Sequence, residues 1–236
     1  MKFFILFAVL VYTINCRHIK IWNNCPITVW AGFLFPDNQM DGGVKLEAGK
    51  EHKFDDVPDF DYDVMIWPRT YCNETTMWCY TGRCGKDSTT KVGCDGYGPN
   101  FPVTKAYLKL KADGGDDKYW VTLEEGFNLP IQIQPFGVDC EIAGGCSDKE
   151  KNVNEACPRD FAIKLKSAVT VGCKSGCDQR KTPEECCTGK FSGSKCNPRE
   201  TAPLFAKSCP KMLTHKYDKE EKKSTCVGAT YLVQFC

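Results

Sequence analysis

The seventeen cysteines of this 236-residue chain constrain its fold more than any other feature. Residues 1–16 resemble a cleaved secretory signal, because Lys2 precedes an apolar run of about a dozen residues. That run is too short to span a bilayer, which needs roughly 20 apolar residues. If Cys16 leaves with the signal, the remaining cysteines form an even set that eight disulfides would use completely. Export would also supply the oxidising compartment in which disulfides persist.

Cys79 and Cys84, in the stretch W-C-Y-T-G-R-C, are compatible with a metal site, a redox pair or a structural disulfide loop. Zinc sites combine short cysteine spacings with further Cys or His ligands. The three histidines, His18, His52 and His215, do not lie close to a cysteine pair. A redox motif would favour the spacing C-x-x-C. We therefore expect structural disulfides, no metal and no cofactor.

Charge and composition narrow the classes of partner. Hydrophobic residues make up 42% of the chain, which is enough to bury a substantial core. Lys and Arg number 31 against 30 Asp and Glu, so no strong field favours nucleic acid. No basic patch with interleaved aromatic residues occurs in the sequence. We expect no nucleic-acid partner and no transmembrane segment.

Short segments of alternating or β-branched residues predict a mainly β fold. They are residues 19–22, 27–30, 63–67, 107–111, 119–123, 131–134 and 230–235. Turn-forming residues separate them, a pattern typical of a sandwich or a barrel. Between Cys140 and Cys209 the strand signals weaken and cysteines become dense, so this segment needs disulfides to hold its shape. Within it, 158–165 and 203–207 are predicted short helices, and the charged run 219–223 is predicted to be a solvated loop.

Several segments of the chain resemble the signature sequences of one protein family. They read N-N-C-P-I-T-V-W-A at 23–31, W-P-R-T-Y-C at 67–72, C-Y-T-G-R-C at 79–84, G-F-N-L-P at 126–130, C-C-T at 186–188 and V-Q-F-C at 233–236. With them the chain is similar to the thaumatin-like family, pathogenesis-related group five, over almost its whole mature length. The resemblance implies a flattened β-sandwich beside a disulfide-rich subdomain of loops and helices.

The resemblance also implies the disulfide pairing, which cysteine spacing alone could not select. The implied pairs are Cys25–Cys236, Cys72–Cys79, Cys84–Cys94, Cys140–Cys226, Cys146–Cys209, Cys157–Cys173, Cys177–Cys186 and Cys187–Cys196. We divide the chain into a signal peptide (1–16), a β-sandwich core (17–139), a disulfide-rich subdomain (140–215) and a C-terminal loop and strand that return to the sandwich (216–236). With no spare thiol, the mature chain is expected to be a monomer.

In this family, function is attached to a cleft between the sandwich and the subdomain, lined in many members by one Arg and four carboxylates. Carried over by position, the Arg corresponds to Met65, and two of the carboxylates correspond to Lys105 and Trp120. Glu125 and Asp218 keep their charge. The resemblance therefore implies a degenerate acidic cleft in which Glu125 and Asp218 are the candidate ligand-binding residues.

Members of the family bind β-1,3-glucans, some hydrolyse them weakly, and many act against fungi. Hydrolysis needs two carboxyl groups, and with Lys105 in place of the family's Glu, Glu125 loses a natural partner. Glu124 is expected to face away, since adjacent residues of a strand point to opposite sides. We therefore expect a secreted, antifungal defence protein that binds a microbial cell-wall polysaccharide without catalysis. The alternatives are a weak endo-β-1,3-glucanase with a rearranged carboxylate pair, such as Glu125 and Asp218, and a module that binds or inhibits a partner protein.

Two further features concern the surface. Trp78, Tyr80, Tyr97 and Phe101 lie around the C-Y-T-G-R-C motif, where they either stack on sugar rings or cover a small disulfide core. Asn73 begins the sequon Asn-Glu-Thr directly after Cys72, and we expect it to be glycosylated in a host that performs this modification.

Overall fold

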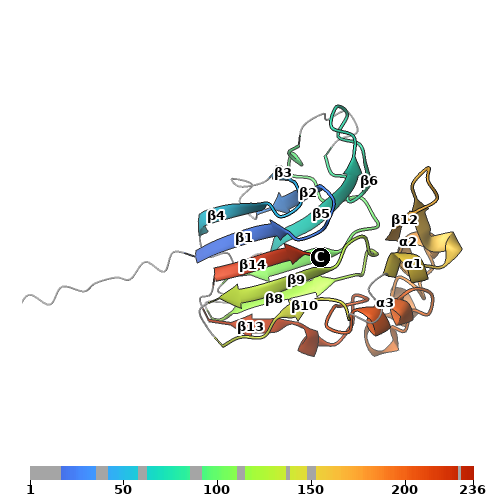
Figure 1. Cartoon of the computed structure of the whole chain (residues 1–236). Coiled ribbons are helices and arrows are strands. Elements are labelled where there is room, and N and C mark those ends of the chain that lie inside the picture. The colour runs from blue at the N-terminus through green and yellow to red at the C-terminus, as the bar shows by residue number, and fades with distance from the viewer. Residues whose placement is uncertain are drawn as a thin grey trace, which may run out of the picture.

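The structure is a computed structural model that describes residues 17–35, 42–57, 63–85, 92–110, 115–136, 139–147, 153–227 and 230–236. The expected signal segment, 1–16, lies outside these residues. Strands form layered sheets, and the described helices gather at one end of them (Figure 1). None of the described helices has the length and apolar character needed to cross a membrane.

One sheet of the described chain contains five strands in the order β10-β9-β14-β1-β4. Their bounds are β1 Arg17–Asn23, β4 Glu51–Val57, β9 Ile131–Phe136, β10 Ala143–Gly144 and β14 Thr230–Phe235. β1 and β14, from opposite ends of the chain, pair in parallel. β9 runs on through Pro135, although the sequence predicted it to end one residue earlier. Proline is tolerated there because β10 pairs only with Ile133 and Gln132, leaving one side of β9 at Pro135 without a described partner strand.

The second sheet of the described chain follows the order β13-β8-β7-β5-β2-β3, with β6 paired to β5. Its strands are β2 Val29–Leu34, β3 Gly42–Leu46, β5 Val64–Cys72, β6 Cys79–Thr81, β7 Lys105–Lys109, β8 Asp117–Thr122 and β13 Ser224–Cys226. All seven segments predicted as strands overlap strands of the structure. The sequence pattern did not predict β3 or β4. In β4 the reason is that most residues are charged and only Phe54 and Val57 are buried among its described side chains.

The core lies between the two sheets, where alternate residues of each strand point inward. Ile19 and Ile21 of β1 and Val233 of β14 join Tyr119 and Val121 of β8 in one fully buried cluster. The residues between them in sequence face outward, as a period of two requires. The predicted sandwich is therefore the observed architecture.

The disulfide-rich segment adds short elements to one end of the sandwich. They are α1 Val153–Ala156, α2 Gly176–Arg180, α3 Ala202–Ser208 and the two-stranded sheet of β11 Ala162–Lys164 and β12 Thr170–Cys173. α3 confirms the predicted helix at 203–207. The predicted helix at 158–165 is wrong: after a single 3-10 turn, Arg159–Phe161, the chain enters β11, which pairs with β12. A partner strand from later in the chain overrides the local helical pattern.

The charged run 219–223 also departs from the prediction of a simple solvated loop. It contains a 3-10 turn, Glu220–Lys222. Lys222 donates to Met212 O at 2.9 Å and to Asp218 at 2.7 Å, while Lys223 lies 4.9 Å from the centre of the Trp120 ring. The run therefore contributes cations to contacts with the second sheet and with the segment after α3.

Eight disulfides connect the described residues, and they are the eight pairs implied by the family resemblance. They are Cys25–Cys236, Cys72–Cys79, Cys84–Cys94, Cys140–Cys226, Cys146–Cys209, Cys157–Cys173, Cys177–Cys186 and Cys187–Cys196. Cys25–Cys236 spans a sequence separation of 211 and joins the ends of the parallel pair β1 and β14. Closing so long a loop restricts the unfolded chain by roughly 4–5 kcal/mol in the loop-entropy account.

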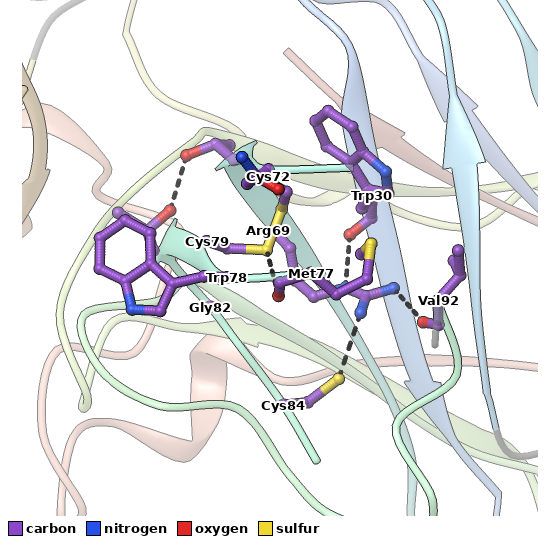
Figure 2. The surroundings of a disulfide bond; sticks show 12 residues. Trp30, Arg69, Cys72, Met77, Trp78, Cys79, Gly82, Cys84 and Val92 are labelled. Atoms are coloured by element: carbon purple, nitrogen blue, oxygen red, sulfur yellow. Dashed lines mark hydrogen bonds between the residues drawn. A yellow bond between two sulfur atoms is a disulfide. The ribbon is translucent and has the colours of Figure 1, made fainter. Parts of the chain in front are cut away.

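A buried arginine lies beside the C-Y-T-G-R-C motif. Arg69 is 1% exposed and donates to the backbone oxygens of Trp30 at 3.0 Å, Ala31 at 3.0 Å and Val92 at 2.7 Å. Figure 2 shows its guanidinium group between β2 and the loop that contains Val92. Burial lowers the pKa of Arg69 to about 10. Carbonyl dipoles thus replace the carboxylate that usually accompanies a buried cation.

Candidate functional site

A cleft opens where the second sheet meets the disulfide-rich segment. Its described lining comes from the approach to β7, the turn after β8, the start of α2, the loop before α3 and the segment after α3. The lining residues are Phe101, Glu124, Glu125, Ser175, Gly176, Cys177, Asp178, Lys181, Glu185, Cys186, Cys187, Pro198, Thr201, Ala202, Thr214, His215 and Lys216. The cavity measures about 190 Å³. It therefore lies at the interface where the family resemblance places a cleft.

Gly126 determines how the turn after β8 meets the disulfide-rich segment. Its φ is +102°, and a Cβ there would lie 2.6 Å both from Cys173 O and from Pro102 Cβ. The next residue, Phe127, exchanges two backbone hydrogen bonds with Cys173, at 2.8 and 2.7 Å. Only glycine allows this close approach with a positive φ. The conformation brings Glu125 beside the chain that carries Phe101.

Asn128, in the same motif, binds this region to the second sheet. Its side-chain nitrogen donates to Pro68 O at 2.8 Å and to Thr81 Oγ1 at 2.9 Å, while its oxygen accepts from Thr104 N at 3.0 Å. Asn128 is fully buried, so each of these bonds is made away from water. The G-F-N-L-P motif therefore anchors the chain that follows Glu125 to the second sheet, and none of its residues line the cleft.

Glu125 lines the cleft, and Lys105 forms an ion pair with it. The Lys105 side chain is only 9% exposed and the Glu125 side chain 27%. Burial alone would lower the pKa of Lys105, but Tyr107 and Glu125 outweigh that effect and raise it. Lys105 consequently stays charged beside Glu125, although it is not itself among the lining residues. A cation occupies the position at which the family resemblance expects a second carboxylate.

The other two departed positions belong to a column of side chains on the outer face of the second sheet. Lys105 Nζ lies 5.3 Å from the centre of the Tyr107 ring. The Trp120 ring stacks with Tyr107, with ring centres 5.3 Å apart and an interplanar angle of 15°. Lys223 lies 4.9 Å from the centre of the Trp120 ring. Met65 is the register partner of Tyr107 on β5. At Trp120, stacking and a cation–π contact stand where the family resemblance implies a carboxylate.

Asp218 is held by its own segment and is not among the residues that line the cleft. It accepts from Thr214 N at 2.9 Å, from Lys219 N at 2.8 Å and from Lys222 Nζ at 2.7 Å. Burial would raise the pKa of Asp218, but Lys222 and the backbone donors outweigh it and lower the pKa. Of the two carboxylates singled out from the sequence, the structure therefore places only Glu125 in the cleft lining.

Glu124 was expected to face away from Glu125, and this expectation is wrong. β8 ends at Thr122, so both glutamates lie in a turn, where strand alternation no longer applies, and both line the cleft. Although the Glu124 side chain keeps solvent access, the surrounding protein and the charge of Glu125 raise its pKa. The error follows from extending the strand past its true end.

Two further carboxylates of the cleft come from the disulfide-rich segment. Asp178 lies in the first turn of α2, where Ser175 accepts from its backbone N–H at 3.2 Å, and its carboxylate pairs with Lys181 at 2.7 Å. Glu185 accepts from Arg199 N at 2.8 Å. No sequence signal marked either residue, because neither belongs to a motif. The cleft therefore combines the expected Glu125 with three carboxylates that were not expected there, Glu124, Asp178 and Glu185.

Among the aromatic residues around the C-Y-T-G-R-C motif, Phe101 alone lines the cleft. It is 44% exposed, so its ring is available to a ligand. Trp78 and Tyr97 are also exposed, at 46% and 44%, and Trp78 contacts Tyr80 edge-on at 4.7 Å. These residues are therefore not simply a cover for a disulfide core.

His215 also lines the cleft, with its Nδ1 3.0 Å from the Cys196 sulfur. Burial lowers the pKa of His215, and Asp218 offsets this only in part. Cys187, Cys196 and His215 lie close enough to resemble a metal-binding group. The two cysteines are bonded to each other, so they offer no thiolate, and metal coordination there does not fit.

Comparison with known proteins agrees with the family resemblance of the sequence motifs. The sequence model described as "Thaumatin family" matches residues 23–236. Pathogenesis-related protein 5 of Arabidopsis thaliana is 34% identical, with the alignment covering 99% of this chain and 95% of that protein. A Prunus avium protein named glucan endo-1,3-beta-glucosidase is 33% identical, over 92% of this chain and 89% of its own. The solved structure of a thaumatin-like xylanase inhibitor aligns with a TM-score of 0.48 and 19% identity, covering 92% of this chain and 98% of that one. This structural match is too distant to support a conclusion about function.

Proposed function

Because the chain belongs to the thaumatin family, we propose that it is a secreted defence protein that binds a microbial cell-wall polysaccharide without hydrolysing it. The expected ligand is a neutral glucan of the β-1,3 type. Secretion rests on the signal-like residues 1–16 and on the eight disulfides, which favour an oxidising compartment. We also propose that the mature protein is a monomer.

One observation carries this proposal: an exposed phenylalanine ring and four carboxylates line the same cleft. Sugars present hydroxyl groups, which donate hydrogen bonds to carboxylates, and faces of C–H groups, which pack against aromatic rings. Glu124, Glu125, Asp178 and Glu185 are the acceptors, and Phe101 is the platform. Pockets that enclose a drug-sized ligand measure about 300–1,000 Å³. At about 190 Å³, the enclosed part of this cleft suits a single sugar unit of a longer chain.

The same geometry disfavours hydrolysis. Glycoside hydrolases need two carboxyl groups placed on either side of the scissile bond, one acting as proton donor and the other as nucleophile or base. Here Glu125 is ion-paired with Lys105, and Asp218 accepts hydrogen bonds from its own segment. Neither carboxylate is left to take the second role.

One observation favours the glucanase alternative, namely the raised pKa of Glu124 beside the charged Glu125. A carboxyl group whose pKa is raised beside a second carboxylate is the pattern of an acid and its partner. Lys105 neutralises that partner, so we rank this function second.

Retention on insoluble β-1,3-glucan and on chitin tests the binding proposal. We expect the mature protein to be retained on the glucan, and Phe101→Ala to weaken retention about 2- to 10-fold, the equivalent of a lost stacking contact. Tyr97→Ala is the matched control, because Tyr97 is equally exposed but does not line the cleft. No retention on either polysaccharide would refute the proposal and leave the protein-partner alternative.

Release of reducing ends from a soluble β-1,3-glucan tests for catalysis. The mature protein should give no signal above the blank, as should Glu124→Gln, Glu125→Gln and Asp218→Asn. Activity that is abolished by one of these substitutions would establish the glucanase function instead and identify the carboxyl group responsible.

A further inference from the structure

The tip of the β5–β6 hairpin presents the sequon Asn73-Glu74-Thr75 at the surface. The Cys72–Cys79 disulfide closes the hairpin immediately before it, and Asn73 itself is exposed. Glu74 pairs with Lys45 at 2.6 Å, which connects the tip to β3. A surface loop is the setting in which an N-linked glycan is accommodated by a folded protein.

The Asn73 side chain uses its oxygen to hold the turn. Oδ1 accepts from Thr75 N at 3.0 Å, from Thr76 N at 2.9 Å and from Thr76 Oγ1 at 3.2 Å. All three bonds involve the oxygen, whereas a glycan is attached through the nitrogen Nδ2. The turn therefore keeps these contacts when Nδ2 is substituted, and the folded hairpin is compatible with the modification.

Trp78 lies across the hairpin from Asn73. The backbone N–H of Asn73 donates to Trp78 O at 2.8 Å, next to the paired Cys72 and Cys79. This hydrogen bond makes Asn73 and Trp78 neighbours at the base of the turn, just beyond the last paired residues of β5 and β6. Figure 2 shows the Trp78 indole pointing away from the bond between Cys72 and Cys79. The indole is 46% exposed and contacts Tyr80 edge-on, so much of its surface faces solvent.

From this arrangement we infer that Asn73 carries an N-linked glycan whose first sugar packs against Trp78. The 2.8 Å backbone hydrogen bond holds Asn73 and Trp78 next to each other, and both side chains are exposed, so a sugar on Nδ2 is within reach of the indole. The C–H face of a pyranose and the indole would exclude water from each other. The glycan thereby covers an aromatic surface that the fold leaves exposed.

The modification requires a lipid diphosphate-linked oligosaccharide, which supplies the glycan as the chain enters the secretory pathway. The bond between Asn73 Nδ2 and the anomeric carbon forms, the bond from that carbon to the diphosphate oxygen breaks, and Nδ2 loses one proton. The lipid diphosphate is the leaving group. The inference therefore depends on export and is independent of what the cleft binds.

The first test is the mass of the full chain after secretion from a eukaryotic cell that glycosylates a control protein. We expect a mass larger than that of the polypeptide, with the added glycan located on the peptide that contains Asn73. Thr75→Ala removes the sequon and should abolish the added mass, whereas Thr75→Ser keeps the sequon and should retain it. An unmodified Asn73 in the secreted wild-type chain would overturn the inference.

The second test concerns the contact with Trp78. Acrylamide quenching of tryptophan fluorescence should be stronger in the unglycosylated Thr75→Ala variant than in glycosylated wild type or Thr75→Ser. Trp78→Phe, added to both wild type and Thr75→Ala, should remove the difference, because Trp30, which Lys45 connects to Glu74, is only 6% exposed. Equal quenching of wild type and Thr75→Ala would refute packing on Trp78, even with the glycan present.

Discussion

Replacing Lys105 by methionine tests whether a cation holds Glu125 in the cleft wall. Methionine has a similar length and no charge, so the substitution removes the ion pair with little change in volume. Breaking a buried pair on one side costs about 3–5 kcal/mol. The Glu125 side chain is 27% exposed and can recruit water, so we expect the free energy of unfolding to fall by about 2 kcal/mol. For a chain of this size that corresponds to about 4–8 °C in the unfolding temperature.

A double-mutant cycle separates this pair from a general loss of packing. Glu125→Gln should also destabilise, because it leaves the buried Lys105 with Tyr107 as its remaining contact. The variant with both substitutions contains neither charge and should lose less than the sum of the single effects, by at least about 1 kcal/mol. Calorimetric unfolding of the four proteins at equal concentration gives the coupling. If the two single-mutant effects sum to the double-mutant effect within about 0.5 kcal/mol, the ion-pair account is refuted.

The pH dependence of the difference provides a second check. The folded-state pKa of Lys105 is raised, because Tyr107 and Glu125 outweigh the opposite effect of burial. The stability due to its charge is therefore fully present below the unfolded value of about 10.4 and is lost as pH rises through the folded pKa. The difference between wild type and Lys105→Met should stay constant from about pH 6 to 8 and shrink above about pH 10.5. A difference that changes between pH 6 and 8 would contradict this assignment.

Three further substitutions test other parts of the structure. Arg69→Met leaves three backbone carbonyl groups without their donor. It should lower the free energy of unfolding, measured in urea, by about 2–4 kcal/mol. An unchanged urea midpoint would contradict a stabilising role for Arg69. Asp218→Asn should lower the free energy of unfolding by about 1–2 kcal/mol at pH 7. The pKa of Asp218 is lowered in the folded state. The stability from its charge is therefore present above about pH 3.9 and is lost as pH falls through the folded-state pKa. Its difference from wild type should shrink as pH falls below about 3.9, and a constant difference would exclude the ion pair with Lys222 as the cause. Gly126→Ala should both lower the unfolding temperature and weaken retention on glucan, because a Cβ would lie 2.6 Å from Cys173 O. Wild-type values for both would show that the close approach of Gly126 to Cys173 is dispensable.

The disulfides and the strands depend on patterns that a single sequence carries. The even set of cysteines that follows Cys16 predicted eight bridges, and resemblance of whole motifs supplied their pairing. Alternating segments such as 19–22 and 230–235 overlap β1 and β14 because the period of two is imposed by one buried face. By contrast, β4 was missed because its charged residues hide that period. The helix predicted at 158–165 gave way to β11 because β12 supplies a partner from further along the chain.

The candidate site shows most clearly where sequence and tertiary structure divide. Resemblance to the family's motifs singled out Glu125 and implied that Lys105 stands in place of a family carboxylate. That Lys105 binds Glu125, and that Glu124, Asp178 and Phe101 line one cleft, depends on segments far apart in the chain. Strand alternation predicts facing only as far as a strand extends, and β8 ends before the glutamates. Long-range packing alone decides which side chains meet beyond that point, because no local pattern records the distance between separate loops.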